Sequence, residues 1–309
     1  MQWPSARPAR DLWSALRFWR AFQRLHPGLF PARDAALGLR SLLLPQRLRH
    51  RHDARRFREA CEVVPHGRGI DRVYVRPLDV SFLWPSPAAG HLWHPIEQEV
   101  LPSNPHCYTT PPVRLGPEST VLDIGACEGL FALRILRGGL ARHVTCFEPF
   151  PSMAALLREA AALNHLADRI TVVEQAACNH SGEVGFRTDL GSDSSQVIPD
   201  PPPGFEGLRV RSVRIDEWLA ERGQRLGPRD LIKIDAEGAD LDVLMGAERT
   251  LREDAPQVAV TTYHADDHAD RIHAWLRSVQ PRYRFRLKGF SFWTPHPRPV
   301  LLQASAHGP

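Results

Sequence analysis

Acidic residues follow short apolar segments in this chain, at positions where carboxylates could bind a ligand. The sequence TVLDIGACEGLFALRIL, residues 120–136, places Asp123 near the end of one such segment. Gly125 and Gly129 come next, and Glu148 follows the next apolar segment, 25 residues after Asp123. A strand, a glycine turn and a helix N-terminus in this order commonly hold a nucleotide-like cofactor. The spacing therefore predicts a cofactor of this class.

The composition of the glycine turn distinguishes between cofactors. A dinucleotide site uses GxGxxG to hold a pyrophosphate on helix amides, with an acid about 20 residues further on. This chain has DxGxxxG, with Glu128 inside the turn, where it would repel a pyrophosphate. Ala126 keeps bulk away from a ligand, and an acid such as Glu148 can accept hydrogen bonds from both hydroxyls of a ribose. The turn favours a ligand with an amino acid end and a positive centre, and it disfavours a nicotinamide-dependent oxidoreductase.

A second set of residues could move protons. Asp235 and Glu237 lie in LIKIDAEGADL, and His264 lies in TTYHADD. A positioned base accelerates reactions of hydroxyl groups by roughly 10² to 10⁴, and histidine has a suitable unperturbed pKa. We therefore expect these three side chains to be catalytic, with His264 the first candidate for the general base and hydrogen bonding to the substrate or a structural role as its alternatives.

The same acids raise the question of a metal. Together with Asp240 and Asp242 they offer oxygen ligands, which suit Mg²⁺ or Ca²⁺. However, a strand-to-helix turn points successive side chains in different directions, and acids at a helix start are favoured by the helix dipole. The five cysteines show neither CxxC nor His/Cys ligand spacing, so neither a disulfide framework nor a zinc site is indicated. A divalent metal is thus possible but not favoured.

Regular alternation of strands and helices must position these residues. Apolar segments at 120–124, 143–147, 170–174, 231–235 and 257–263 read as strands. They are separated by helical patterns such as SMAALLREAAALNHL, with Ser152 as its N-cap, and ADLDVLMGAERTL. This alternation predicts an α/β fold with a mostly parallel sheet and helices on both faces. Ligands of such sheets bind beyond the carboxyl ends of the strands, where the strand order reverses.

The chain divides near residue 110 into a basic N-terminal extension, 1–110, and a domain, 111–309. Residues 1–60 contain 13 Arg, no Lys and four acids, a net charge of +9, and the other 249 residues carry −5. A nucleic-acid-binding protein usually carries its basic face on the folded domain itself. We therefore expect no nucleic acid partner. The extension is helical at first, then made of strands and loops, and its aromatic residues could cover a substrate or simply pack.

The segment ARDLWSALRFWRAFQRL, residues 9–25, has the pattern of a basic amphipathic helix. Such a helix could dock on its own domain, on a second subunit of a homodimer, or on a membrane surface. No apolar run approaches the roughly 20 residues that cross a bilayer, and the N-terminus has Arg and Trp where a secretory signal would be apolar. We expect a cytoplasmic protein.

Several motifs together resemble one family. VLDIGACEG, TCFEPFP, VVEQAACNHSGEVGF, LIKIDAEGADLDVLMGAERTL and VTTYHADD, in this order, are similar to the FkbM family of S-adenosylmethionine-dependent methyltransferases, over residues 118–305. The resemblance implies the Rossmann-like class I methyltransferase fold with a seven-stranded sheet. It also implies S-adenosylmethionine as methyl donor and O-methylation of a sugar or natural-product hydroxyl. Cys127 departs from the Asn frequent in the family, which puts one polar contact to the cofactor in doubt.

The resemblance also implies roles for individual residues. In the family pattern the glycine turn faces the methionine portion, the acid after the second strand takes the ribose, and the residues past the third strand border the adenine. Asp123 holds the turn or the amino group, and Asp235 lies beneath the methyl group. The implied cofactor-binding residues are Asp123, Gly125, Ala126, Gly129, Glu148, Pro149, Gln175, Ala176 and Asp235.

Two further classes of function remain alternatives. A methyltransferase acting on a peptide or protein needs the same site, but a broad groove in place of a pocket. A catalytically inactive S-adenosylmethionine-binding module would need no acids for chemistry. The presence of Asp235 and Glu237 therefore argues against this class. We expect a small-molecule acceptor that carries a hydroxyl group.

Overall fold

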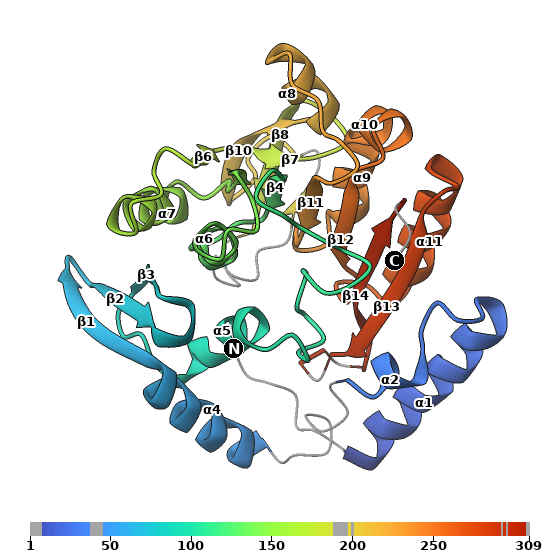
Figure 1. The fold of residues 1–309 in the computed structure, drawn as a ribbon, viewed down its shortest axis with the longest axis horizontal. Helices are drawn as coiled ribbons and strands as arrows, with labels where there is room; N and C mark the ends of the chain where they lie inside the picture. Colours follow the sequence, from blue (N-terminus) through green and yellow to red (C-terminus); the bar gives the residue numbers. More distant parts are fainter. Residues whose placement is uncertain are drawn as a thin grey trace.

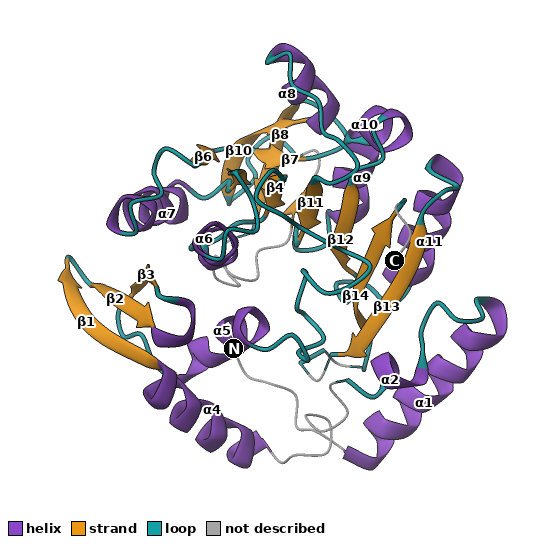
Figure 2. Cartoon of the chain, viewed as in Figure 1, coloured by secondary structure: helices purple, strands orange, loops and turns teal. Residues whose placement is uncertain are grey.

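The computed structural model describes residues 8–37, 46–187, 197–198, 201–291, 293–294 and 296–306. A seven-stranded sheet forms its centre (Figure 2). The strand order is β13-β14-β12-β11-β4-β5-β6. The strands are β4 (Thr120–Ile124), β5 (His143–Phe147), β6 (Ile170–Val173), β11 (Leu231–Ile234), β12 (Gln257–Thr261), β13 (Arg284–Phe290) and β14 (Pro299–Ser305).

The direction of the strands confirms the predicted class I methyltransferase fold. Strands β6, β5, β4, β11 and β12 run parallel, and β14 is antiparallel to both of its neighbours, β12 and β13. From β4 the chain adds strands outward through β5 to β6, then returns to β11 on the other side of β4. The order therefore reverses between β4 and β11, which is where such sheets bind ligands.

Helices cover both faces of the sheet, as predicted. On one face α6 (Leu130–Arg137) and α7 (Pro151–Leu163) bury Leu133 and Leu157 in a cluster with Val121 of β4. The other face is covered by α8 (Ile215–Glu221), α9 (Asp240–Gly246), α10 (Glu248–Glu253) and α11 (His268–Val279). They share a second cluster with Leu122, the next residue of β4. Successive strand residues alternate between faces, so strands that are covered on both faces are largely apolar.

Three details of the sequence-based expectation need correction. Ser152 is not the N-cap of its helix: α7 starts at Pro151, and Phe150 is the N-cap. Proline is favoured at the first helical position because the amide it lacks would have no partner there. The helix expected over 239–251 is divided into α9 and α10 at Ala247. The expected strand ends extend one or two residues beyond β6, β11 and β12.

A smaller four-stranded sheet, in the order β7-β10-β8-β9, flanks the carboxyl end of β6. It consists of β7 (Ala176–Ala177), β8 (Gly182–Phe186), β9 (Val197–Ile198) and β10 (Leu208–Val213). Its buried side chains, Val184, Phe186 and Val210, pack with Phe150 and Met153 at the start of α7.

The N-terminal extension begins with a helix that docks on the sheet edge (Figure 1). The apolar face of α1 (Pro8–Leu25) buries Ala15 and Phe22 in the same cluster as β13, and the Phe18 and Phe290 rings lie 6.0 Å apart. On the opposite face of α1, Arg17, Arg20 and Arg24 are exposed. Of the alternatives for this helix, the structure shows docking on its own chain. The short helix α2 (Ala32–Ala35) follows beside β13.

The rest of the extension packs on the other side of the domain. It comprises α4 (Gln46–Ala60), β1 (Cys61–Gly67), β2 (Ile70–Val75), the 3₁₀ turns Arg76–Leu78 and Gly90–Leu92, β3 (Val80–Pro85) and α5 (Trp93–Val100). Phe82 and Leu83 of β3 join the cluster of α6 and α7. The amide of Asn164 after α7 pairs with both the N–H and the C=O of Ser81. None of the helices in the described ranges has the length and apolar content needed to cross a membrane.

Candidate active site

A cavity of about 960 Å³ lies at the carboxyl ends of the parallel strands, at the reversal of strand order. Residues that directly follow β4, β5, β11 and β12 form its floor, and the extension and the segment before β14 add walls. The cavity brings together most of the predicted site residues. These are Gly125, Ala126, Glu148, Pro149, Gln175, Ala176, Asp235, Glu237 and His264.

The glycine turn needs glycine at two positions. Gly125 has φ 74°, and a Cβ added there would lie 1.9 Å from the backbone oxygen of Asp235. Gly129 has φ 82°, and its Cβ would lie 2.7 Å from Leu157. Both positions favour glycine because left-handed backbone is strained for other residues. Gly129 does not line the cavity; it lets α6 begin directly on α7.

Asp123 also lies outside the cavity lining. It is fully buried, and its Oδ1 lies 2.8 Å from Nζ of Lys233. Lys233 in turn donates a hydrogen bond to the carbonyl of Gly125, at 2.9 Å. Burial would lower the pKa of Lys233, but Asp123 and neighbouring carboxylates raise it above its ordinary value. Of the two predicted roles of Asp123, this geometry supports holding the turn.

Glu148, which directly follows β5, holds the glycine turn beside the end of that strand. Its Oε2 accepts the N–H of Cys127 at 2.8 Å, and its Oε1 accepts the N–H of Phe150 at 2.9 Å. Burial raises the pKa of Glu148 to about 7, although these two hydrogen bonds favour the ionised form. A carboxylate can accept further bonds on its remaining lone pairs. Glu148 can therefore take hydroxyl donors from a ligand.

An apolar slot adjoins Glu148. Phe150 and Phe186 lie with ring centroids 5.1 Å apart, and Val184 and Cys178 pack beside them. All four line the cavity, as do Gln175 and Ala176. Apolar walls with a few polar groups at one end suit a planar heterocycle attached to a polar ring.

Asp235 is surrounded by hydroxyl donors and two histidines. Its Oδ2 accepts the hydroxyl of Tyr108 at 2.8 Å, and its Oδ1 accepts those of Thr261 at 3.2 Å and Tyr263 at 3.3 Å. The Nε2 atoms of His106 and His264 lie 3.5 and 3.6 Å away. Burial alone would raise the pKa of Asp235, but the two histidines and Lys233 hold it well below its usual range. Asp235 is therefore an ionised acceptor.

His264 lies between carboxylates on two sides. Its Nδ1 is 2.7 Å from Oδ2 of Asp240, and its Nε2 is 3.6 Å from both Asp235 and Glu237. Burial would lower the pKa of His264, but Asp240 and then Asp235 raise it to about 9. Within the described part of the chain, Nε2 has no hydrogen-bond partner. Glu237 has φ 49°, an uncommon conformation that occurs at functional sites.

Two groups of side chains in the described ranges are close enough to hold a metal ion. One consists of Asp235, Glu237 and His264, and the other of Asp240, His264 and His268. The carboxylate of Asp235 already accepts hydrogen bonds from hydroxyl groups, and that of Asp240 accepts them from the backbone amides of Ala236 and Gly238. These contacts explain the positions of both acids without an ion, so we assign them no metal.

The extension contributes site residues that the sequence-based prediction lacks. His106 and Tyr108 precede β4 and contact Asp235, and His94 of α5 lies with Trp293 in the cavity wall, their ring centroids 4.8 Å apart. Tyr263 packs on Trp293 at 5.2 Å. The only sequence signal for these residues is the density of aromatic and histidine residues before residue 110, which packing alone could explain.

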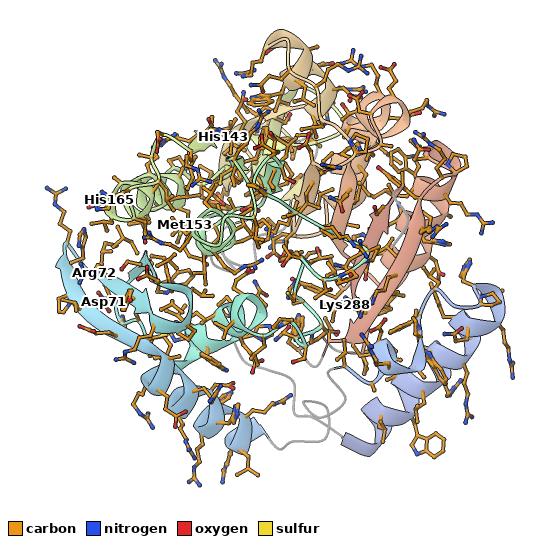
Figure 3. The ribbon with its side chains drawn as sticks, viewed as in Figure 1. Asp71, Arg72, His143, Met153, His165 and Lys288 are labelled. Carbon is orange, nitrogen blue, oxygen red and sulfur yellow. The ribbon has the colours of Figure 1, made fainter. Side chains whose placement is uncertain are left out.

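A buried lysine fixes the loop that carries His106 and Tyr108. Lys288 of β13, labelled in Figure 3, is fully buried and lies beside this loop. Its Nζ donates to the carbonyl of Cys107 at 3.0 Å and to the hydroxyl of Thr110 at 2.9 Å. Burial lowers the pKa of Lys288 to about 8. The sheet edge thereby positions a loop more than 170 residues away in sequence.

Comparison with known protein families shows which family this chain belongs to. The family described as the methyltransferase FkbM domain matches residues 123–287, more than half of the sequence. The chain belongs to the FkbM methyltransferase family. The match begins at Asp123, so the cavity walls from the extension lie outside the shared region.

Relatives within the FkbM family include two named O-methyltransferases. The chain is 33% identical over 150 residues to 2-O-methyltransferase NoeI of Sinorhizobium fredii (strain NBRC 101917 / NGR234), a match that covers 44% of this chain and 60% of NoeI. It is 27% identical over 203 residues to 31-O-demethyl-FK506 methyltransferase FkbM of Streptomyces tacrolimicus, covering 55% and 75% of the two chains. A solved FkbM methyltransferase of Methylobacillus flagellatus KT has 20% identity and a TM-score of 0.47 over 70% of this chain and 54% of its own.

Proposed function

We propose that this protein is an S-adenosylmethionine-dependent O-methyltransferase that acts on a hydroxyl group of a sugar or natural-product small molecule. The observation that carries the proposal is that one cavity joins two different sites. The glycine turn, Glu148 and the apolar slot form one end, and the His264–Asp240 pair stands beside Asp235 at the other. A cofactor site beside a candidate base is what transfer to a hydroxyl requires.

The residues at the first end fit the cofactor. The apolar slot that Phe150 and Phe186 help to line suits an adenine, and Glu148 suits the ribose hydroxyls. The acidic surroundings of the turn, with Glu128 in the cavity wall, suit a ligand with cationic groups. Bound there, S-adenosylmethionine would supply an electrophilic methyl group.

Residues at the second end would activate the acceptor. Neutral His264 can take a proton at Nε2, while Asp240 on Nδ1 fixes the ring and stabilises its charged form. Asp235 holds the hydroxyls of Tyr108 and Tyr263 in place around the same point. Much of the rate then comes from positioning, because the acceptor oxygen must lie close to the methyl carbon.

The walls of the second end favour a compact, polyhydroxylated acceptor. Trp84, His94, Gln98 and Trp293 line the cavity, a mixture of aromatic surface and hydrogen-bonding groups, and Trp293 packs on Tyr263 at the second end. The names of NoeI and FkbM describe methyl transfer to oxygen in those relatives. Because the extension forms part of the cavity wall, we favour a small molecule over a peptide.

Transfer of a labelled methyl group tests this function. The purified chain would be incubated with S-adenosylmethionine that carries a deuterated methyl group, and with panels of glycans, hydroxylated natural products and peptides. Mass spectrometry should find label on a hydroxyl of a small molecule, and the His264→Gln variant should lose it. Label on peptides alone would contradict the assigned acceptor class. Binding of the cofactor without transfer to any panel would favour an inactive binding module.

A further inference from the structure

The extension places a buried acid, Glu99, in the cavity wall, and the chemistry above does not use it. We propose that Glu99 of α5 binds the α-ammonium group of the methionine half of the cofactor. The inference rests on the proposed function, since it assumes that S-adenosylmethionine occupies the cavity. Glu99 lies before residue 123, outside the region that the family shares, so the family pattern assigns it no role.

Glu99 is held in the cavity wall by one oxygen only. Its side chain is 2% exposed, and its Oε2 accepts a hydrogen bond from Nε of Arg134 at 2.6 Å. Among the residues that the structure describes, Oε1 has no hydrogen-bond partner. A buried carboxylate oxygen without a donor is costly, and the cost is larger when the group is charged. A ligand that brings a donor to Oε1 removes this cost.

The location of Glu99 matches the amino acid end of the cofactor. Its partner Arg134 belongs to α6, the helix that begins at the glycine turn, and Nη2 of Arg134 is fixed by the hydroxyl of Thr109 at 3.0 Å. Burial raises the pKa of Glu128 in the turn, and the nearby Glu99 charge raises it further. Glu99 therefore acts electrostatically on the turn.

The charges around this point favour a cation. Glu99 and Glu128 both line the cavity, on α5 and in the glycine turn. The charge of Arg134 is paired with Glu99, and that of Lys233 is paired with Asp123. An ammonium group has three N–H donors and a full positive charge, so it can satisfy Oε1 of Glu99.

A neighbouring acid provides a matched control. Glu97 lies on the same helix, but it accepts hydrogen bonds from Nε1 of Trp93 at 3.3 Å and from the amide of Asn104 at 3.0 Å. It is not part of the cavity wall. Glu97→Gln therefore makes the same chemical change on α5 without touching the proposed contact.

Calorimetric titration with two ligands tests the inference. The ligands are S-adenosylhomocysteine and its desamino analogue, which has hydrogen in place of the amino group. The wild-type chain should bind S-adenosylhomocysteine about tenfold to a hundredfold more tightly than the analogue, because charge-assisted hydrogen bonds contribute most of that difference. Glu99→Gln should remove the preference by weakening only S-adenosylhomocysteine, and Glu97→Gln should retain it.

The outcomes separate this inference from the proposed function. Equal weakening of both ligands in Glu99→Gln, or an unchanged preference, would overturn the role of Glu99. If the wild-type chain bound neither ligand, the proposed function itself would fail. Thermal denaturation would verify folding, and if Glu99→Gln does not fold, Glu99→Asp preserves the charge for Arg134 and should still reduce the preference.

Discussion

Nδ1 of His264 lies 2.7 Å from Oδ2 of Asp240, an acid that also accepts the backbone N–H groups of Ala236 and Gly238. The same carboxylate therefore fixes the turn after β11 and orients the histidine after β12. Its charge also makes His264 more basic than an ordinary histidine. The two strand ends are thereby coupled through one buried side chain.

The pKa of His264 gives the first prediction. NMR titration of the ring should show a midpoint near pH 9, well above the ordinary value for histidine. Asp240→Asn should move the midpoint to lower pH, because it removes the closest charge that stabilises the imidazolium. His273, whose pKa is lowered by burial and by the charges of His26 and Arg277, gives an internal control in the same spectra. A His264 midpoint at or below 6.5 would contradict the electrostatic assignment.

The pH dependence of methyl transfer follows from the same pKa. A general base works only when it is unprotonated, so kcat/KM for the acceptor should rise with pH, reach half of its maximum near pH 9 and level off above that. In Asp240→Asn the rising part of the profile should move to lower pH. His264→Gln should lower kcat by roughly 10² to 10⁴ and abolish this part of the profile. Unchanged activity of His264→Gln would exclude His264 as the base.

Substitution of Gly125 tests the close contact between the turn and β11. Gly125→Ala should destabilise the protein by several kcal/mol and abolish cofactor binding, because the new Cβ would lie 1.9 Å from a backbone oxygen. Gly139→Ala is the matched control: its φ is 65°, but nothing lies within 4 Å of the added carbon. It should cost only about 1 kcal/mol. Denaturant unfolding would measure the free energy of unfolding of both variants. An equal loss of stability in Gly125→Ala and Gly139→Ala would contradict the steric account.

The docking of α2 depends on one buried ion pair. Nε of Arg286 on β13 donates to Oδ2 of Asp34 at 2.7 Å, and Asp34 is 3% exposed. Asp34→Ala leaves the guanidinium without its partner, so we expect a loss of about 3 to 5 kcal/mol in the free energy of unfolding. Arg252→Ala breaks an exposed pair with Glu248 and should cost less than about 1 kcal/mol. A similar small cost for Asp34→Ala would show that the pair does not hold α2.

The sequence predicts the sheet and the clustering of the glycine turn with Glu148 well, since both depend on local patterns. Strand β4, the turn at Gly125 and Glu148 follow each other within 30 residues, and each has a residue type that its place requires. The surroundings of Asp235 are different. Tyr108 reaches Asp235 from 127 positions away, and Lys288 holds the loop of Tyr108 from the far edge of the sheet. No periodicity in sequence reports contacts of this kind.

The most direct test of the account is calorimetric titration of the folded chain with S-adenosylmethionine and S-adenosylhomocysteine, with NADH as control. We predict micromolar binding of both, no binding of NADH, and loss of binding in Glu148→Ala, whose carboxylate reaches both the turn and the cavity. Absence of binding by the wild-type chain, or binding of NADH in place of the two sulfur ligands, would contradict the cofactor assignment on which the proposed function depends.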